Sequence, residues 1–219
     1  LGDRSALAAV GLSNVMTNIL GYSWLWGLSG AISTLSAQDW GAGAYASIGI
    51  TLQRGFLILA CFADLPLMVL WLNSEFIMDS AGQPAEVAKY VGLYTRIRIP
   101  GILCETISTT LNRTLNSIGN TRISSVVSLV VSIVNVASSM ILIPRYGFVG
   151  APITATLCDI VNVVLTCFLA LRTEDFLKCW NGLDARAWKE WSSFLKISLP
   201  SFVLLASEAW CWNLQDFIA

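Results

Sequence analysis

No charged side chain occurs between Arg4 and Asp39, a run of 34 consecutive residues. About 20 predominantly apolar residues are enough for a helix to cross the ~30 Å hydrocarbon core of a bilayer. Comparable uncharged runs recur along the chain, which predicts that lipid surrounds most of it. Inside a bilayer every backbone polar group must be paired within the protein, which leaves helices or closed β-barrels. Because the apolar runs are continuous and do not alternate with a period of two, they predict helices.

The overall composition agrees with a membrane protein. Of the 219 residues, 55% are hydrophobic and 12% are charged, and the mean hydropathy is +0.67. The 13 basic and 14 acidic side chains are too few to cover a soluble globule of this size. The net charge of −1 and the lack of a basic run predict no nucleic-acid partner. The chain has no His, which excludes His-based catalysis and His metal ligands, and no metal site is predicted.

The uncharged runs predict an all-α integral membrane protein, a polytopic bundle of about six transmembrane helices. We expect the spans at residues 6–36, 46–72, 87–111, 121–144, 149–171 and 192–217. The segment 172–191 is the one strongly charged stretch, and it marks the clearest boundary in the sequence. The chain therefore divides into a five-helix unit at 1–171, a connector at 172–191 and a last helix at 192–219. Asp184 is expected to cap a helix that runs into the last span.

Basic residues predict the orientation in the membrane. The connectors at 37–55, 112–122 and 172–191 together hold seven Lys and Arg residues, whereas the opposite side holds three. Cytoplasmic connectors are enriched in basic residues, so the first group is predicted to face the cytoplasm.

Polar residues inside the predicted spans are the candidates for function, because a charge within lipid costs about 2.5–3.5 kcal/mol on insertion scales. The charged candidates are Asp64, Arg96, Arg98, Glu105, Asp159 and Glu208. Other polar or aromatic residues recur at helical spacing and predict a partly polar cavity, lined by Asn135, Asn162, Ser201, Trp212 and Gln215.

Most of these residues also have a structural interpretation. Small and hydroxyl side chains on one helix face mark close helix packing as well as a polar cavity. Arg96 and Arg98 either extend to the membrane surface, pair with a carboxylate or contact a substrate. Glu208 lies near the middle of its span with no basic residue nearby in sequence, which favours a functional role. We expect Glu208 to bind or couple a cation, with Asp159 and Asp64 as further candidates.

Residues 27–55, GLSGAISTLSAQDWGAGAYASIGITLQRG, resemble the MATE family of multidrug and toxin extrusion transporters, especially its eukaryotic branch. The likeness continues in order through IPG at 99–101, LNRTLN at 111–116, GFVGA at 147–151 and LPSFVLLASEAW at 199–210. The motif residues that the match emphasises are Gln38, Gly41, Arg54, Pro100, Gly101 and Arg113.

The resemblance implies a fold of twelve helices in two six-helix lobes, of which this chain corresponds to helices two through seven. The remaining half of the transporter is then a missing partner, and residues 172–191 link the lobes. Glu208 matches the family's first acidic residue of the seventh helix. Asn213 stands where many eukaryotic members carry a second acid, and Asp39 stands where the family has a small residue.

The function implied by the resemblance is antiport, in which an organic, often cationic, solute leaves in exchange for H⁺ or Na⁺, with no other cofactor. The expected location is the plasma membrane or a vacuolar or other endomembrane. The first alternative is a flippase for lipid-linked saccharides or a polysaccharide exporter of related fold, which a basic cavity around Arg96 and Arg98 would favour. A membrane-embedded enzyme is a more distant alternative, because no nucleophile–base pair or metal cluster is evident.

Overall fold

The computed structural model describes the backbone of residues 2–218 and the side chains of residues 8–18, 21–204 and 207. Within residues 2–218 the secondary structure consists of helices joined by turns and short loops, with no strand. Six long helical stretches in this part of the chain correspond to the six predicted spans, although several boundaries differ.

The first two stretches each contain a π-helical turn. One joins α1 (Gly2–Thr17), η1 (Asn18–Tyr22) and α2 (Ser23–Gly41). The next joins α3 (Tyr45–Leu59), η2 (Ala60–Asp64) and α4 (Leu65–Leu72). The other four are α6 (Ala85–Ser117), α7 (Thr121–Tyr146), α8 (Gly150–Ala170) and α10 (Trp191–Ile218). At 1.5 Å per residue the first stretch is about 60 Å long, so it must tilt or extend beyond the hydrocarbon core.

Three predicted connectors turn out to be partly helical. Residues 37–41 form the last turn of α2, which is closed by a hydrogen bond of 3.0 Å from Ala42 N to Gln38 O. Helix α6 continues through residues 112–117, where Thr114 and Leu115 are buried. The connector at 73–86 contains α5 (Ser74–Ser80). Polarity alone predicted loops here, and packing against neighbouring helices decided otherwise.

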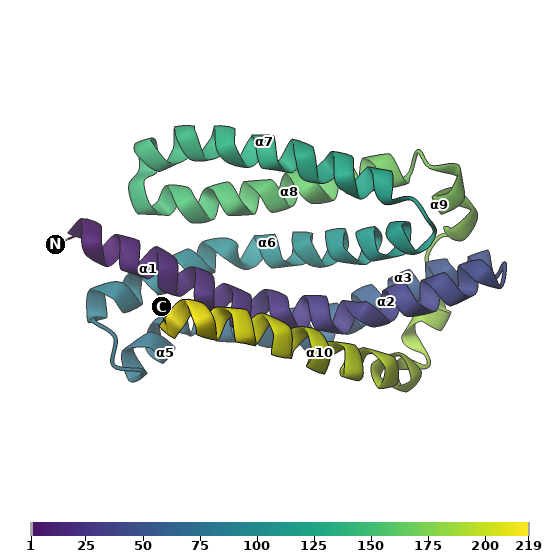
Figure 1. Cartoon of the computed structure of the whole chain (residues 1–219), viewed down its shortest axis with the longest axis horizontal. Coiled ribbons are helices and arrows are strands. Elements are labelled where there is room, and N and C mark those ends of the chain that lie inside the picture. Colours follow the sequence, from purple (N-terminus) through teal and green to yellow (C-terminus); the bar gives the residue numbers. More distant parts are fainter. Residues whose placement is uncertain (1, 219) are drawn as a thin grey trace.

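Helix α6 lies at the centre of the bundle (Figure 1). It packs against α8 on one side and against α1 and α2 on the other. Helix α7 packs mainly against α8, and α10 mainly against α2, so these pairs form the two outer layers. Side chains on α6 therefore meet residues from most of the other long helices.

Helices α2 and α10 approach closely because α2 presents glycines at the contact. A Cβ atom at Gly27 would lie 2.8 Å from the Cα of Phe202, and one at Gly30 would lie 2.8 Å from the Cβ of Ser201. Small residues permit such close backbone approach in membrane bundles, where van der Waals packing drives helix association. The last helix is thereby packed tightly against the first long stretch.

Helix α7 presents an apolar face to its surroundings. Leu129, Ile133 and Met140 are 65%, 62% and 73% exposed. A contiguous exposed apolar surface is unfavourable in water and is favourable against lipid tails. By length and composition alone, two described stretches qualify as membrane spans, Tyr45–Leu72 and Thr121–Ala170, and the second contains both α7 and α8.

The charged segment 172–191 contains α9 (Glu174–Cys179) and a 3₁₀ turn, η4 (Ala185–Trp188). Asp184 caps η4, because its Oδ1 accepts a hydrogen bond of 2.8 Å from the backbone N–H of Arg186. The prediction that Asp184 caps the helix of the last span was wrong. The capped turn ends at Trp188, and α10 begins at Trp191 after Glu190, whose φ of 60° turns the chain.

Candidate functional site

A buried carboxyl group lies in the second helical stretch. Asp64, the last residue of η2, is 1% exposed, and its Oδ1 accepts a hydrogen bond of 2.8 Å from Thr106 Oγ1 on α6. The Oδ2 atom is also buried and has no hydrogen-bond partner among the described residues. None of the ion pairs in the described part of the chain involves Asp64. An ionisable group in this environment is by default a candidate for ion or proton binding.

The π-helical turn explains how Asp64 is placed. Pro66 follows η2, and in a regular α-helix its ring would clash with the carbonyl of Phe62 and leave that carbonyl without a donor. The wider turn at Ala60–Asp64 accommodates the proline, and Ala63 and Asp64 both face the protein interior. π-helical turns inside α-helices occur frequently at functional sites.

An ion pair joins α6 to α8. Arg98 Nη1 lies 2.5 Å from Asp159 Oδ2, and the two side chains are 6% and 16% exposed. Gly101 makes room for the pair, because a Cβ atom there would lie 3.0 Å from Arg98 Nη1 and would clash with the Asp159 carboxylate. The Arg98 guanidinium also lies 5.6 Å from the ring centroid of Tyr22, a cation–π distance. The sequence left open whether Arg98 pairs with a carboxylate, and the structure identifies Asp159 as the partner.

Helix α6 itself carries a carboxyl group, that of Glu105, two turns after Arg98. Glu105 Oε1 accepts hydrogen bonds from Trp26 Nε1 at 3.4 Å and from Thr109 Oγ1 at 3.1 Å. Trp26 stacks on Tyr22, with ring centroids 5.9 Å apart. Glu105 lies seven residues after Arg98 on α6, so this part of the bundle holds one guanidinium and two carboxyl groups. The cluster joins residues of α2, α6 and α8 through the contacts Trp26–Glu105 and Arg98–Asp159.

Arg113 connects α6 to α2, although the sequence placed it in a connector. Its Nε donates a hydrogen bond of 3.3 Å to Ser29 Oγ. One turn later, Ser117 Oγ donates to the backbone carbonyl of Ser33 at 3.2 Å. This motif residue thus contributes to the packing of two long helices.

The other predicted cavity residues are scattered in this structure. Asn162 Oδ1 accepts from Thr166 Oγ1 at 3.3 Å, and Ser201 Oγ donates to the Ile197 carbonyl at 3.3 Å, so both bond within their own helices. Asn135 is exposed and lies 3.6 Å from Cys158 Sγ. Of the motif residues, Gln38, Gly41 and Pro100 are exposed. The side chains of Glu208, Trp212 and Gln215 lie outside the described residues.

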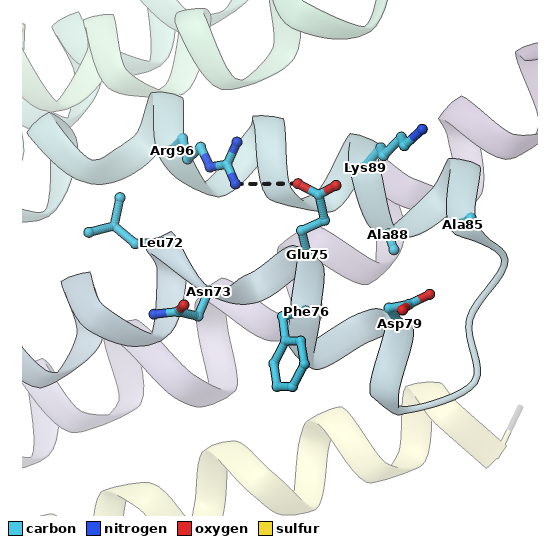
Figure 2. A pocket seen from close by; sticks show the side chains of 9 residues that line it. All are labelled: Leu72, Asn73, Glu75, Phe76, Asp79, Ala85, Ala88, Lys89 and Arg96. Carbon is cyan, nitrogen blue, oxygen red and sulfur yellow. Dashed lines mark hydrogen bonds and ion pairs between the residues drawn. The ribbon is translucent and has the colours of Figure 1, made fainter.

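A small polar cavity of about 440 Å³ lies between α5 and α6 (Figure 2). Arg96 on its edge pairs with Glu75, with Nη2 and Oε2 3.3 Å apart. The side chains are 52% and 39% exposed, so this pair is solvated, in contrast to Arg98 and Asp159.

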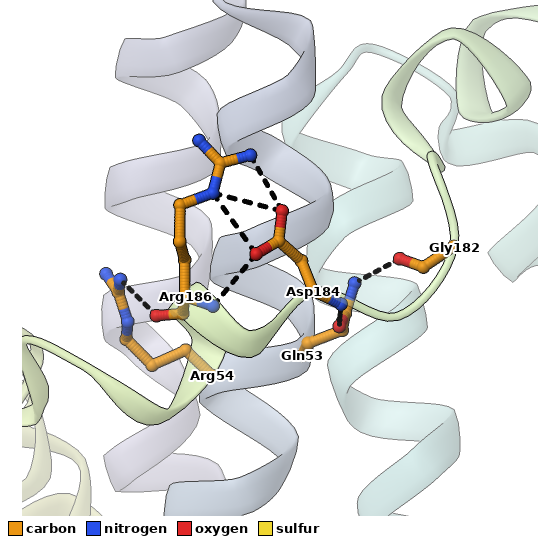
Figure 3. Close-up of polar contacts among 5 residues, drawn as sticks. All are labelled: Gln53, Arg54, Gly182, Asp184 and Arg186. Atoms are coloured by element: carbon orange, nitrogen blue, oxygen red, sulfur yellow. Dashed lines mark hydrogen bonds and ion pairs between the residues drawn. The ribbon is translucent and has the colours of Figure 1, made fainter.

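Gln53 and Arg54, at the end of the L-Q-R motif on α3, bind the charged segment (Figure 3). Gln53 Nε2 donates to the Gly182 carbonyl and its Oε1 accepts from the Asp184 backbone N–H, each at 2.9 Å. Arg54 Nη2 donates to the Arg186 carbonyl at 3.2 Å. Arg54 Nη2 also lies 3.4 Å from Glu190 Oε2. We call these four hydrogen-bonded or ionic contacts the α3 clasp.

Arg186 also bonds to Asp184 within the charged segment, because its backbone N–H and its guanidinium both donate to the Asp184 carboxylate. Hydrogen bonds from its side chain and its backbone N–H lower the pKa of Asp184 from 3.8 to about 2. Asp184 therefore stays ionised throughout the physiological range and keeps η4 capped.

Removing the Gln53 amide should loosen the charged segment. Gln53→Leu leaves the Gly182 carbonyl and the Asp184 N–H unpaired, and two hydrogen bonds are worth about 1–3 kcal/mol together. We expect faster amide hydrogen exchange at residues 182–190 in the whole protein, measured by mass spectrometry. Gln83→Leu makes the same change at an exposed site and serves as the control. Equal exchange in both variants would show that the α3 clasp does not hold the segment.

Sequence reasoning missed several contributors to these sites. Thr106, Tyr22 and Trp26 are neutral, and nothing in their local sequence shows which acid or base they will meet. Gln53 lies next to Arg54 in the stretch 27–55 that resembles the MATE family, and that resemblance is the signal that could have identified it.

The profile of the MatE family matches residues 1–141. The chain is 28% identical over 211 residues to Protein DETOXIFICATION 16 of Arabidopsis thaliana, covering 95% of this chain and 43% of that protein. It is 27% identical over 219 residues to Multidrug and toxin extrusion protein 1 of Oryctolagus cuniculus, covering 99% of this chain and 38% of that protein. The chain thus spans less than half the length of these relatives.

Solved structures agree on the fold. The crystal structure of the eukaryotic MATE transporter AtDTX14 matches with a TM-score of 0.84 and 21% identity, over 95% of this chain and 47% of that one. An inward-facing multidrug resistance MATE transporter of the MOP superfamily matches with a TM-score of 0.74 and 20% identity, over 94% and 47%. These neighbours are polytopic helical bundles, which confirms the predicted all-α membrane fold.

Proposed function

The chain belongs to the MatE family, as its motifs predicted, and we propose that it forms part of a secondary antiporter. In this proposal the whole transporter exports organic, often cationic, solutes in exchange for H⁺ or Na⁺. Membership of this family points to a transporter rather than an enzyme. The protein is an integral membrane protein, and we place it in the plasma membrane or in a vacuolar or other endomembrane.

Antiport requires a site that binds the coupling ion and two arrangements of the helices that open to opposite sides. Ion binding must favour one arrangement over the other, because a ligand shifts an equilibrium only by its difference in affinity for the two states. A buried acid at a contact between two helices meets this requirement, since its charge changes when a proton or Na⁺ binds.

The burial of the Asp64 carboxyl group is the observation that carries this proposal. It is buried between η2 and α6, has one hydrogen bond from Thr106, and has a second oxygen without a partner among the described residues. Binding of H⁺ or Na⁺ to that oxygen would neutralise a charge that is otherwise unfavourable inside the bundle. We infer that Asp64 contributes to coupling together with Glu208.

Asp159 is a weaker candidate for coupling, because Arg98 already neutralises it at 2.5 Å. A cation would have to displace the guanidinium before it could bind there. The same pair bears on the saccharide flippase, which would need a basic cavity. Arg96 and Arg98 both pair with carboxylates, so the argument for a basic cavity loses its support.

Asp64→Asn tests the proposal. The amide keeps the shape and can still accept from Thr106, so the stability should change by less than about 1 kcal/mol. It cannot take up a proton or neutralise Na⁺, so we expect loss of gradient-driven transport. The measurement is accumulation of a fluorescent organic cation by vesicles that contain the whole transporter, under an imposed pH or Na⁺ gradient.

Asp79→Asn is the matched control, because Asp79 is an exposed acid on α5. It should transport normally. Normal uphill transport by well-folded Asp64→Asn would remove Asp64 from the coupling site. If neither a pH gradient nor a Na⁺ gradient drives uptake by the unmodified protein, the proposed antiport itself is contradicted.

A further inference from the structure

A second cavity lies where the segment 172–191 folds back over α3, α6 and α8. Its volume is about 830 Å³, within the ~300–1,000 Å³ typical of small-molecule sites. Its walls are mostly aliphatic and aromatic, and include Phe56, Leu57, Ile107, Leu111, Phe176 and Trp188. The α3 clasp holds the segment that closes one side of this cavity.

Three polar side chains that line the cavity, Gln53, Thr110 and Asp184, are already bonded to other groups. Gln53 is engaged by the backbone of the segment 172–191, and Asp184 by Arg186. Thr110 Oγ1 donates to the Thr106 carbonyl of its own helix at 3.0 Å. Sites for polar solutes contain a few convergent polar groups that fix the ligand's orientation. Since these three are used internally, the cavity suits a flexible apolar chain.

The position of the cavity also favours lipid. Trp180 and Trp188 form part of its lining, and tryptophan concentrates where lipid headgroups meet the hydrocarbon core. Leu183 on its edge is 91% exposed and Trp188 is 64% exposed. An opening lined by such residues at the end of membrane helices borders the acyl chains of one leaflet.

The charges near the edge select the kind of lipid. Three acids of the segment 172–191 are paired, in the contacts Lys178–Asp175, Arg186–Asp184 and Arg54–Glu190. Arg172 follows the lining residue Leu171, and Lys189 follows the lining residue Trp188. No ion pair among the described residues involves Arg172 or Lys189. Among the acids of the segment, only Glu174 is likewise absent from these ion pairs. The Arg172 guanidinium lies over the Phe168 ring, 4.3 Å from its centroid, which leaves its charge without a counter-ion. Two basic residues against Glu174 make the unpaired charge of the segment positive.

We propose that this cavity binds one acyl chain of an anionic phospholipid, with the lipid phosphate held by Arg172 and Lys189. The side concerned is the one predicted to be cytoplasmic, where anionic lipids are concentrated. The bound chain fills the space between α3, α6 and the segment 172–191, and so supports that segment in place. This assignment does not depend on which solute or coupling ion the transporter uses.

Photolabelling tests the acyl-chain site. The whole protein is placed in phosphatidylcholine nanodiscs that contain a phosphatidylserine probe with a diazirine in one acyl chain. After irradiation, mass spectrometry locates the labelled peptides. We expect labelling at residues 107–111 above that at Ile133 and Met140, which report ordinary lipid contact on the exposed face of α7. Labelling no greater than on α7 would overturn the proposal.

Filling the cavity provides a second comparison. Leu57→Trp should reduce labelling at residues 107–111 to background while labelling of α7 stays unchanged. Leu57→Ala enlarges the cavity and should keep the label. Persistence of the label in folded Leu57→Trp would place the probe outside the cavity. Displacement of the label by a transported organic cation would also overturn the proposal, because the occupant would then be the solute.

The headgroup assignment is tested without altering the cavity walls. Arg172→Gln combined with Lys189→Gln should abolish the preference for the phosphatidylserine probe over a phosphatidylcholine probe with the same diazirine chain. Arg145→Gln, at an exposed position near the far end of α7, should retain that preference. Equal labelling by both probes in the unmodified protein, or an unchanged preference in the double variant, would exclude this headgroup site.

Discussion

Arg98→Ala is expected to reduce the free energy of unfolding by about 3–5 kcal/mol, because it leaves the Asp159 carboxylate buried without its partner. The two side chains are 6% and 16% exposed, and the missing side chain of Gly101 gives the pair the space that it occupies. Breaking a buried pair from one side is costly, whereas replacing both members by apolar groups is often tolerated. Combining Arg98→Leu with Asp159→Leu should therefore recover much of the loss.

The same helix offers the matched control. Arg96 is two residues away and pairs with Glu75, but those side chains are 52% and 39% exposed. Exposed pairs contribute about 0–1 kcal/mol, so Arg96→Ala should change little. The measurement is the unfolding of the detergent-solubilised protein, followed by circular dichroism against denaturant concentration. Equal losses of unfolding free energy for Arg96→Ala and Arg98→Ala would show that the buried pair stabilises the fold no more than the exposed pair does.

Glu208→Gln is expected to abolish uphill transport by the whole transporter while the protein still inserts and folds. Its side chain lies outside the described residues, so this expectation rests on the sequence. Glu208 is mid-span on α10, shares a helix face with Ser201 and Gln215, and matches the first acid of the family's seventh helix. Glutamine keeps the shape and removes the group that takes up H⁺ or neutralises a cation.

Vesicle uptake driven by a pH or Na⁺ gradient measures the effect, and Glu174→Gln, an exposed acid in α9, is the control. A structural role for Glu208 predicts the opposite order of effects, with poor expression or stability and near-normal transport by the surviving protein. Normal gradient-driven uptake by well-folded Glu208→Gln would transfer the coupling role to Asp64 or Asp159.

The sequence identified the helices because lipid imposes a simple condition on it. A span must be long and nearly free of charge, and runs such as 5–38 meet that condition without reference to any other residue. The ends of the helices were predicted less well. Helix α6 extends to Ser117 because Arg113 and Ser117 bond to α2, and such long-range contacts are invisible in a local polar stretch.

The sequence also supplied the candidate residues for the site, since a charge within a span is conspicuous wherever it occurs. It could not assign their partners. Asp64 and Asp159 are both acids in apolar helices, yet the fold places one beside Thr106 and the other beside Arg98. The difference follows from which face of α6 each neighbouring helix covers, and that is decided only by packing.

By itself, then, the sequence determined the solvent, the helical class, the approximate spans and the family, because each depends on composition or on local motifs. Only the tertiary structure determined the ion pair between α6 and α8, the hydrogen bond between Thr106 and Asp64, and the α3 clasp on the segment 172–191. These features join residues that lie far apart in the chain, 131 positions in the case of Gln53 and Asp184. Their energies depend on distance and burial, which exist only once the helices have packed.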